Sequence, residues 1–408
     1  MKIILKIAWR NIWRNPRRTW VLISSIAVGV IGYMGTSAFS RGFLEQMVET
    51  TINLQGGHIM IAAKGYHENP NIRLFIKDPT RIQRLLQEMP GIRFAPLVSF
   101  QGMINSTEKA AGVVINGVQP EMESHITVIP QSIVNGRYLA AEDDNNQIVI
   151  GRSLAEMLNV DIGEKVVLMT SDLERTIRSG AFRIVGVFET SSPDFDKAFV
   201  FLPQSRAQSL AGYKEHITAF TLRHDEDIDS ELVVTEIETK IADKDIEVLS
   251  WKARNKLLVL ALQLYDFSVV IMVVILFIAI AFSIANAFLM VIYERIHEIG
   301  IMMANGVFPH RVRKMLYMEA LFISLIGTCV GLLLSAVFIG YFGYFGLDLS
   351  DFAQGLGKFG VGSIVYPSVA AFDVIAGLVT INIIVFLSVL YPSIKASRFE
   401  VVDAIRFV

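Results

Sequence analysis

The sequence has only one cysteine among its 408 residues, Cys329, and it lies inside an apolar run. A lone cysteine excludes a disulfide framework within the chain and a metal site built on several thiolates. Charged residues make up only 19% of the chain, and the formal net charge of −2 gives no basic excess that would indicate a nucleic-acid partner. Hydrophobic residues make up 52%, and the mean hydropathy is +0.47. This composition indicates a membrane protein.

Motifs of common catalytic and metal sites are also missing. The sequence has no G-x-x-x-x-G-K-S/T, so it lacks the backbone cradle and lysine of a P-loop ATPase. It has no H-E-x-x-H or G-x-S-x-G, and its seven histidines are scattered singly. Within the apolar runs the only acids are Glu319 and Asp373, which lie near the ends and suit structural carboxylates better than a protease pair. We therefore predict no catalytic residue, no metal site and no cofactor bound by this chain.

Long apolar runs divide the chain. Four of them can each cross a bilayer as a helix of about 20 residues, and the first is longer than the core of a signal peptide, which predicts a retained anchor. The predicted division is a helix at 1–18, a first span at 19–40, a large insert at 41–256, a stalk and second span at 257–293, a helix and loop at 294–315, a third span at 316–345, an external loop at 346–368, a fourth span at 369–392 and a tail at 393–408.

Lysine and arginine near the helix ends predict the orientation, because basic segments stay on the cytoplasmic side. Such residues lie in three segments: Lys2, Lys6, Arg10, Arg14, Arg17 and Arg18; Arg295, Arg311, Arg313 and Lys314; and Lys395, Arg398 and Arg406. Both termini are therefore expected in the cytoplasm. The insert and the loop between the third and fourth spans are expected outside.

The first 18 residues have the pattern of an amphipathic helix. Basic residues recur every fourth position from Lys2 to Arg14, while Ile3, Ile4, Ile7 and Ile12 occupy another face. This pattern predicts an interfacial helix on the inner leaflet, broken at Pro16 before the first span. A disordered basic leader that only sets the topology is the alternative.

The insert alternates short β-branched runs with polar helical stretches, which predicts an α+β domain. Its predicted elements are strands at His58–Ala63, Val113–Gly117, Ile217–Asp225 and Ile246–Trp251, and helices at Pro79–Met89, capped by Asp78, and at about Ile228–Ala242. The stretch from about Gln119 to Ala211 is rich in strand patterns and glycine. We therefore expect a βαβ-type porter-like subdomain interrupted by a β-rich one. The predicted fold is an α-helical membrane protein with four transmembrane helices and this domain between the first and second spans.

The segment that follows the second span is unusually charged. If that helix continues past Tyr293, Glu294 and Glu298 lie one turn apart, with Ile296, Ile299, Gly300 and Met303 on an adjoining face. Asn305-Gly306 can supply the left-handed residue that ends the helix, and Pro309 prevents its immediate resumption. The alternatives are an amphipathic helix leaving the membrane and an ordinary charged loop. In the third span, Gly327 and Gly331 form a G-x-x-x-G that indicates close helix packing or arises by chance.

Several stretches resemble one known family. ERIHEIGIMMANGVFPHRVRKMLYMEA (Glu294–Ala320) resembles the signature of the FtsX and MacB-type ABC transporter permeases, and YPSIKASRFEVVDAIRF resembles their closing motif. NGRYL, QIVIGRSLAEMLNVDIGEKVVLM and FRIVGVF resemble their extracytoplasmic domain. The layout is most similar to the Lol-type permease subunits that release lipoproteins. MANG at Met303–Gly306 departs from the usual R-A-L/I-G, so a customary basic residue is absent.

The resemblance implies a coupling helix and loop at 294–315 that docks on a separate ABC ATPase. The residues implied in this coupling are Glu294, Arg295, Glu298, Ile299, Gly300, Met303 and Gly306. ATP and Mg would then bind to a dimer of ATPase subunits, and a second permease copy or a related permease would complete the transporter. Motion would pass through the second span to the outer domain by mechanotransmission.

The resemblance further implies a bacterial inner-membrane protein with a periplasmic domain that works on a lipoprotein or another amphiphilic substrate, with a periplasmic carrier as a further partner. Two other functions fit the same layout. One is a MacB-like efflux component that expels periplasmic substrates, and the other is an FtsX-like regulator of cell-wall hydrolases.

Overall fold

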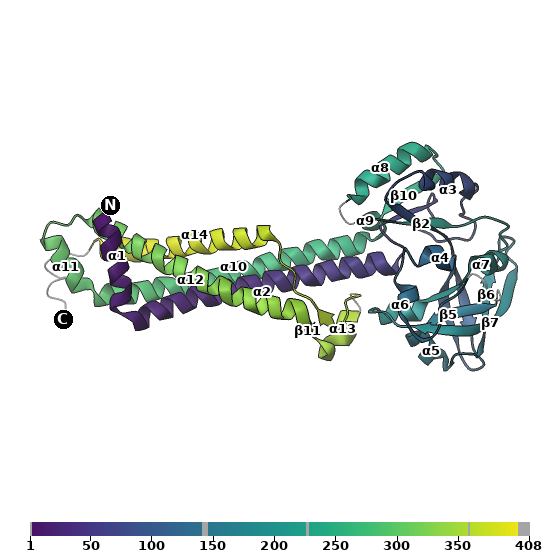
Figure 1. Ribbon diagram of the computed structural model, residues 1–408, viewed down its shortest axis with the longest axis horizontal. Helices are drawn as coiled ribbons and strands as arrows, with labels where there is room; N and C mark the ends of the chain where they lie inside the picture. Colours follow the sequence, from purple (N-terminus) through teal and green to yellow (C-terminus); the bar gives the residue numbers. More distant parts are fainter. Residues whose placement is uncertain (1, 141–145, 226–227, 358–359, 399–408) are drawn as a thin grey trace. The chain divides into compact units, whose positions relative to one another are not determined.

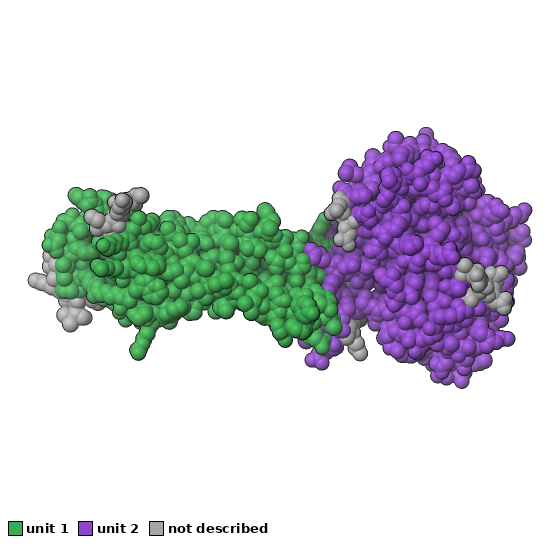
Figure 2. Space-filling model, in the orientation of Figure 1, with its two compact units in different colours: residues 1–44, 262–348, 364–408 green, residues 45–261, 349–363 purple. Residues whose placement is uncertain are grey.

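The computed structural model describes the chain except for residues 1, 141–145, 226–227, 358–359 and 399–408 (Figure 1). Arg406 and the end of the closing motif lie outside the described residues. The chain forms two compact units (Figure 2). Unit 1 comprises residues 1–44, 262–348 and 364–408, and unit 2 comprises residues 45–261 and 349–363.

Unit 1 is helical. Its helices are α1 Lys2–Arg14, α2 Pro16–Leu54, α10 Lys256–Glu294, α11 Ile296–Ala304, α12 Pro309–Phe345 and α14 Ala371–Ala396, with α2 and α10 contributing residues to both units. Four of them, α2, α10, α12 and α14, are long and apolar enough to cross a membrane, as expected from the sequence. They share a core that includes Ile26, Phe288, Ile323 and Val385. A two-stranded sheet, β11 Leu347–Asp348 with β12 Ile364–Val365, precedes α14.

Helix α1 ends before Pro16, which is the first residue of α2, so the predicted break is confirmed. Proline is well tolerated there because the first N–H groups of a helix have no intrahelical acceptor. Ala8 and Ile12 of α1 are buried, and the ring of Trp9 lies 5.3 Å from that of Phe322 on α12. Helix α1 therefore packs against α12 through one face, while Ile7 remains exposed.

The porter-like half of unit 2 has a ferredoxin-like topology. Strand β1 is antiparallel to both β10 and β9, and β9 is antiparallel to β2, so two split βαβ units interleave in the order β10-β1-β9-β2. The elements are β1 Ile59–Ala63, α3 Pro79–Gln87, β2 Ile92–Asn105, β9 Ala219–His224, α8 Ser230–Ile241 and β10 Ile246–Ser250, followed by α9 Trp251–Arg254. The carboxylate of Asp78 accepts from Arg81 N at 3.1 Å, which confirms the predicted cap.

The inserted half lies between β2 and β9 and is rich in strands, as predicted. Its elements are β3 Ala110–Val118, α4 Pro120–Glu123, η1 Ile129–Gln131, β4 Ile133–Gly136, β5 Gln147–Gly151, α5 Arg152–Leu158, β6 Lys165–Ser171, β7 Ile177–Phe188, α6 Pro193–Ala198, β8 Phe199–Pro203 and α7 Gln204–Ala211. Residues of the loop expected between the third and fourth spans also belong to unit 2, as η2 Ser350–Phe352 and α13 Ala353–Gly357.

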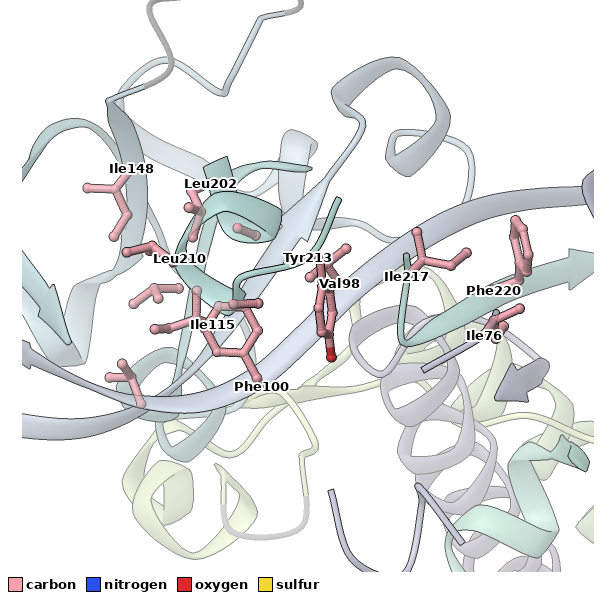
Figure 3. Packing of buried hydrophobic residues seen from close by; sticks show 14 of the residues in the cluster. Ile76, Val98, Phe100, Ile115, Ile148, Leu202, Leu210, Tyr213, Ile217 and Phe220 are labelled. Atoms are coloured by element: carbon pink, nitrogen blue, oxygen red, sulfur yellow. The ribbon is translucent and has the colours of Figure 1, made fainter. Parts of the chain in front are cut away.

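Strand β2 joins the two halves into one ten-stranded sheet. Its residues from Ile92 to Leu97 pair with β9, and those from Leu97 to Asn105 pair with β3. The main hydrophobic core lies on one face of this sheet and includes Val98, Phe100 and Ile115 from its strands (Figure 3). The subdomains are therefore continuous through a shared strand.

Candidate functional site

Helix α11 contains most of the residues that the sequence assigns to coupling, and it is not continuous with the spanning helix before it. Helix α10 ends at Glu294, and Arg295 leaves the helical conformation with φ −107° and ψ 16° before α11 begins. The segment is therefore helical, but the continuation of the second span past Tyr293 is interrupted at Arg295. The break falls at the residue whose side chain reaches Glu319 of α12, a contact between distant parts of the chain that local sequence does not encode.

The end of α11 follows the predicted signal. Gly306 has φ +87°, and its N–H donates to Met303 O at 3.0 Å, while Val307 N donates to Met302 O at 3.1 Å. Pro309, however, is the first residue of α12 rather than part of a loop. Three of the basic residues expected in that loop, Arg311, Arg313 and Lys314, therefore lie on the first turns of α12.

Six charged residues at the ends of these helices form what we name the helix-end charge cluster: Arg14, Arg18, Glu294, Arg295, Glu298 and Glu319. Arg14 Nη2 lies 2.5 Å from Glu298 Oε1, and Arg18 pairs with Glu294. Arg295 Nε lies 3.3 Å from Glu298 Oε2. The cluster thus ties α1 and α2 to α10 and α11.

The buried member of this cluster is Glu319 of α12, which is only 4% exposed. Arg295 Nη1 lies 3.1 Å from its Oε2, and Asn11 Nδ2 of α1 donates to its Oε1 at 2.7 Å. The other acid of the apolar runs, Asp373, pairs with Arg41 at 3.2 Å. Both acids therefore have the ion pairs expected of structural carboxylates.

One side of α11 packs into unit 1. Ile296, Ile299 and Gly300 are buried, and Ile299 shares a small core with Ile292, Val312, Leu316 and Ala396. Met303 is half-buried against the same core. Of the residues assigned to coupling, Glu294, Arg295 and Glu298 thus hold neighbouring helices, Ile299, Gly300 and Met303 pack inward, and Gly306 ends the helix.

The opposite side, which we name the outer face of α11, is exposed and largely apolar. It consists of His297, Ile301, Ala304, Asn305 and the following Phe308. Ile301 is 44% exposed and Phe308 is 59% exposed. Sequence periodicity did not identify this face, because both sides of α11 carry apolar residues and only the fold determines which side is covered.

The G-x-x-x-G of α12 lies directly against α2. A Cβ atom on Gly331 would lie 2.6 Å from Val30 Cβ and 3.0 Å from Ala27 Cα, and one on Gly327 would lie 2.9 Å from Ile26 Cβ. Carbon atoms prefer separations of about 3.5–4.0 Å. The absence of side chains at these two positions therefore allows the close approach of the two helices.

A cavity of about 540 Å³ in unit 1 was not predicted. It lies between α2, α10 and α12, and its lining is mostly apolar, with Phe39, Tyr265, Met272, Phe338 and Phe342 among the larger side chains. No short sequence pattern could have identified it, because the lining residues come from separate helices that meet only in the fold.

Comparison with known proteins identifies the family. Residues 19–240 match the family described as MacB-like periplasmic core domain, and residues 269–401 match the FtsX-like permease C-terminal domain. The chain belongs to the FtsX/MacB-type ABC transporter permeases. The permease is thus a transmembrane subunit that combines four apolar helices with a MacB-like periplasmic core domain.

The curated proteins to which the permease is similar include LolC and MacB. The lipoprotein-releasing system transmembrane protein LolC of Neisseria meningitidis is 23% identical over 401 residues, which cover 95% of this chain and 94% of LolC. The macrolide export ATP-binding/permease protein MacB of Agrobacterium fabrum is 22% identical, over 85% of this chain and 54% of MacB. The crystal structure of the periplasmic region of MacB from Actinobacillus actinomycetemcomitans covers 48% of this chain and 90% of that structure, with 16% identity and a TM-score of 0.35.

Proposed function

We propose that the permease couples ATP hydrolysis by a separate cytoplasmic ABC ATPase to the release of a lipoprotein, or another lipid-anchored substrate, at the outer face of a bacterial inner membrane. The observation that carries this proposal is the similarity to LolC, which extends over 95% of the chain. The two termini and α11 would face the cytoplasm, and unit 2 the periplasm. A second permease, identical or related, and a periplasmic carrier complete the proposed assembly.

The proposed contact with the ATPase is the outer face of α11. An exposed Ile301 and Phe308 on a short helix offer an apolar surface of the kind that is covered in protein interfaces. The helix-end charge cluster has a different role in this proposal. Because Glu298 of α11 pairs with Arg14 of α1 and, through Arg295, is linked to Glu319 of α12, a push on the outer face moves the helix bundle rather than bending α11 alone.

The proposed substrate contact is the apolar cavity of unit 1. Its lining of aromatic and aliphatic side chains suits an acyl chain. Moving an acyl chain from the bilayer into the cavity costs little free energy, because contacts with apolar side chains replace its contacts with lipid tails. A charged or strongly polar cargo would lose its hydration there without compensation. This chemistry supports a lipid-anchored substrate over a charged or strongly polar one.

The coupling proposal is tested by permease-stimulated ATP hydrolysis of a purified partner ATPase. We expect Ile301→Asp on the outer face to abolish stimulation and co-purification, because it buries a charge in the proposed interface. The control is Ile177→Asp in unit 2, where the exposed fraction of the isoleucine is 71%. Equal stimulation by both variants would contradict an ATPase contact at α11.

The substrate proposal is tested in proteoliposomes that contain the permease, the ATPase and an acylated lipoprotein. We expect ATP-dependent release of the lipoprotein to a soluble carrier, and we expect Gly35→Phe, at the lining of the cavity, to reduce release while ATP hydrolysis continues. Release that is unaffected by filling the cavity would contradict the assigned site. ATP-driven export of a macrolide without lipoprotein release would favour the efflux function instead.

A further inference from the structure

A second cavity lies within unit 2, on the face of the sheet opposite the main core. Its volume is about 330 Å³, which is in the range of small-molecule sites. Two rows of cross-strand partners contribute to its floor, Ser99–Asn116–Phe201 and Gln101–Val114–Phe199 on β2, β3 and β8. Cross-strand partners place their side chains on the same face of a sheet. The floor therefore alternates polar and apolar groups.

Five buried polar residues line this cavity, and Arg254, Asn116 and Glu123 are the ones that bear on its ligand. The guanidinium of Arg254, which is 8% exposed, donates from Nη1 to Gln55 O at 2.7 Å and from Nη2 to Gly57 O at 2.6 Å, but its Nε has no partner. The Oδ1 of Asn116, also 8% exposed, has no partner either. Glu123 is 4% exposed, and its Oε1 accepts from Thr127 Oγ1 at 2.8 Å.

The charge of Arg254 is not balanced within the described part of the chain, because none of the carboxylates there forms an ion pair with it. Burial lowers its pKa to about 10, so it remains a cation at neutral pH. Burial raises the pKa of Glu123 to about 7, so near neutral pH a large share of this carboxyl group is protonated and uncharged. A buried cation without a counter-charge is costly. The cavity therefore favours an anion.

We propose that this cavity is a binding site for a small anionic amphiphile that carries an acyl chain, a carboxylate and an amide N–H donor, as an N-acyl amino acid does. The carboxylate lies toward Arg254 and the free Nε–H. The amide N–H donates to Asn116 Oδ1, and the acyl chain packs on Phe199, Phe201 and Val114. The site lies in unit 2 and does not depend on the proposed work on lipoproteins or on the contact at α11.

The alternative is that Arg254 only holds the turn that follows α2, which ends at Leu54. Its bonds to Gln55 O and Gly57 O serve that purpose. They do not account for the unpartnered oxygen of Asn116 or for the cavity beside it, which a purely structural arginine would not require.

The test is equilibrium binding of radiolabelled N-octanoylglycine to the full-length permease in nanodiscs of zwitterionic lipid, with empty nanodiscs subtracted. We expect saturable binding of one molecule per chain. The uncharged N-octanoylglycinamide should bind about tenfold more weakly or worse, because it lacks the charge that meets Arg254. Octanoate, which lacks the amide N–H, should be intermediate.

Variants separate a specific site from partitioning into lipid. Asn116→Asp keeps the side-chain size but adds a negative charge, and we expect it to weaken N-octanoylglycine binding about tenfold or more. Glu121→Gln, an exposed change on the same helix as Glu123, should leave binding unchanged. Equal binding of the charged and uncharged ligands to the unaltered protein would overturn the proposal without any variant, as would the absence of saturable binding.

Discussion

The contact between α2 and α12 gives a quantitative prediction. In Gly331→Ala, the new Cβ would lie 2.6 Å from Val30 Cβ, about 1 Å closer than a relaxed carbon–carbon contact, and 3.0 Å from the backbone atoms Cα and O of Ala27. A side chain could turn away, but backbone atoms move only with the helix. Overpacking of this kind costs about 1–3 kcal/mol. We therefore expect Gly331→Ala to lower the unfolding free energy of unit 1 by that amount relative to the same substitution at a position of α12 without a clash.

The same helix offers a matched control. A Cβ on Gly340, nine residues along α12, would meet nothing within 4 Å, so Gly340→Ala adds the same methyl group without a clash. Alanine is the better helix former by up to about 1 kcal/mol, so this variant should be neutral or slightly stabilised. The assay is unfolding of the full chain from mild detergent, followed by circular dichroism. Equal effects of the two substitutions would refute the close-contact reasoning.

Two further predictions concern buried charges. Glu319→Leu leaves Arg295 without its closest partner and should lower the unfolding free energy by about 3–5 kcal/mol. The double variant Glu319→Leu/Arg295→Met removes the unpaired charge and should regain part of this stability. A double variant no more stable than the single one would contradict this reasoning. Since burial raises the pKa of Glu123 from 4.5 to about 7, the folded state retains a proton that the unfolded chain loses. The stability of unit 2 should therefore be full below about pH 4.5 and fall by up to about 3 kcal/mol as the pH rises past 7. Glu123→Gln should flatten this profile in thermal melts, whereas Glu121→Gln should not.

Features fixed by local chemistry could be predicted from the sequence. Asp78 caps α3 and Gly306 ends α11, because each depends on neighbours within a few residues. The four apolar helices followed from length and hydropathy. The strand-helix-strand patterns at both ends of unit 2 predicted β1, α3, β9, α8 and β10. The second strand of the first pattern was wrong, because β2 Ile92–Asn105 completes the ferredoxin-like half, while the predicted strand Val113–Gly117 lies in β3 of the inserted half.

Features that depend on distant residues could not be predicted. The break at Arg295 coincides with its reach to Glu319, and the pairing of Arg18 with Glu294 joins helices far apart in the sequence. In the sequence, the charged residues of the coupling segment were interpreted as part of a docking surface. In the structure, they form ion pairs that connect α1, α2, α10, α11 and α12. The exposed side of α11 carries Ile301 and Phe308 instead. Both cavities likewise exist only where separate elements meet.

The shared strand β2 has a consequence for how unit 2 responds to load. Leu97 of β2 pairs with both β9 and β3. The ferredoxin-like half and the inserted half therefore cannot separate without breaking main-chain hydrogen bonds of β2. A force applied to either half is therefore transmitted through the whole sheet, and the two halves move together rather than about a hinge.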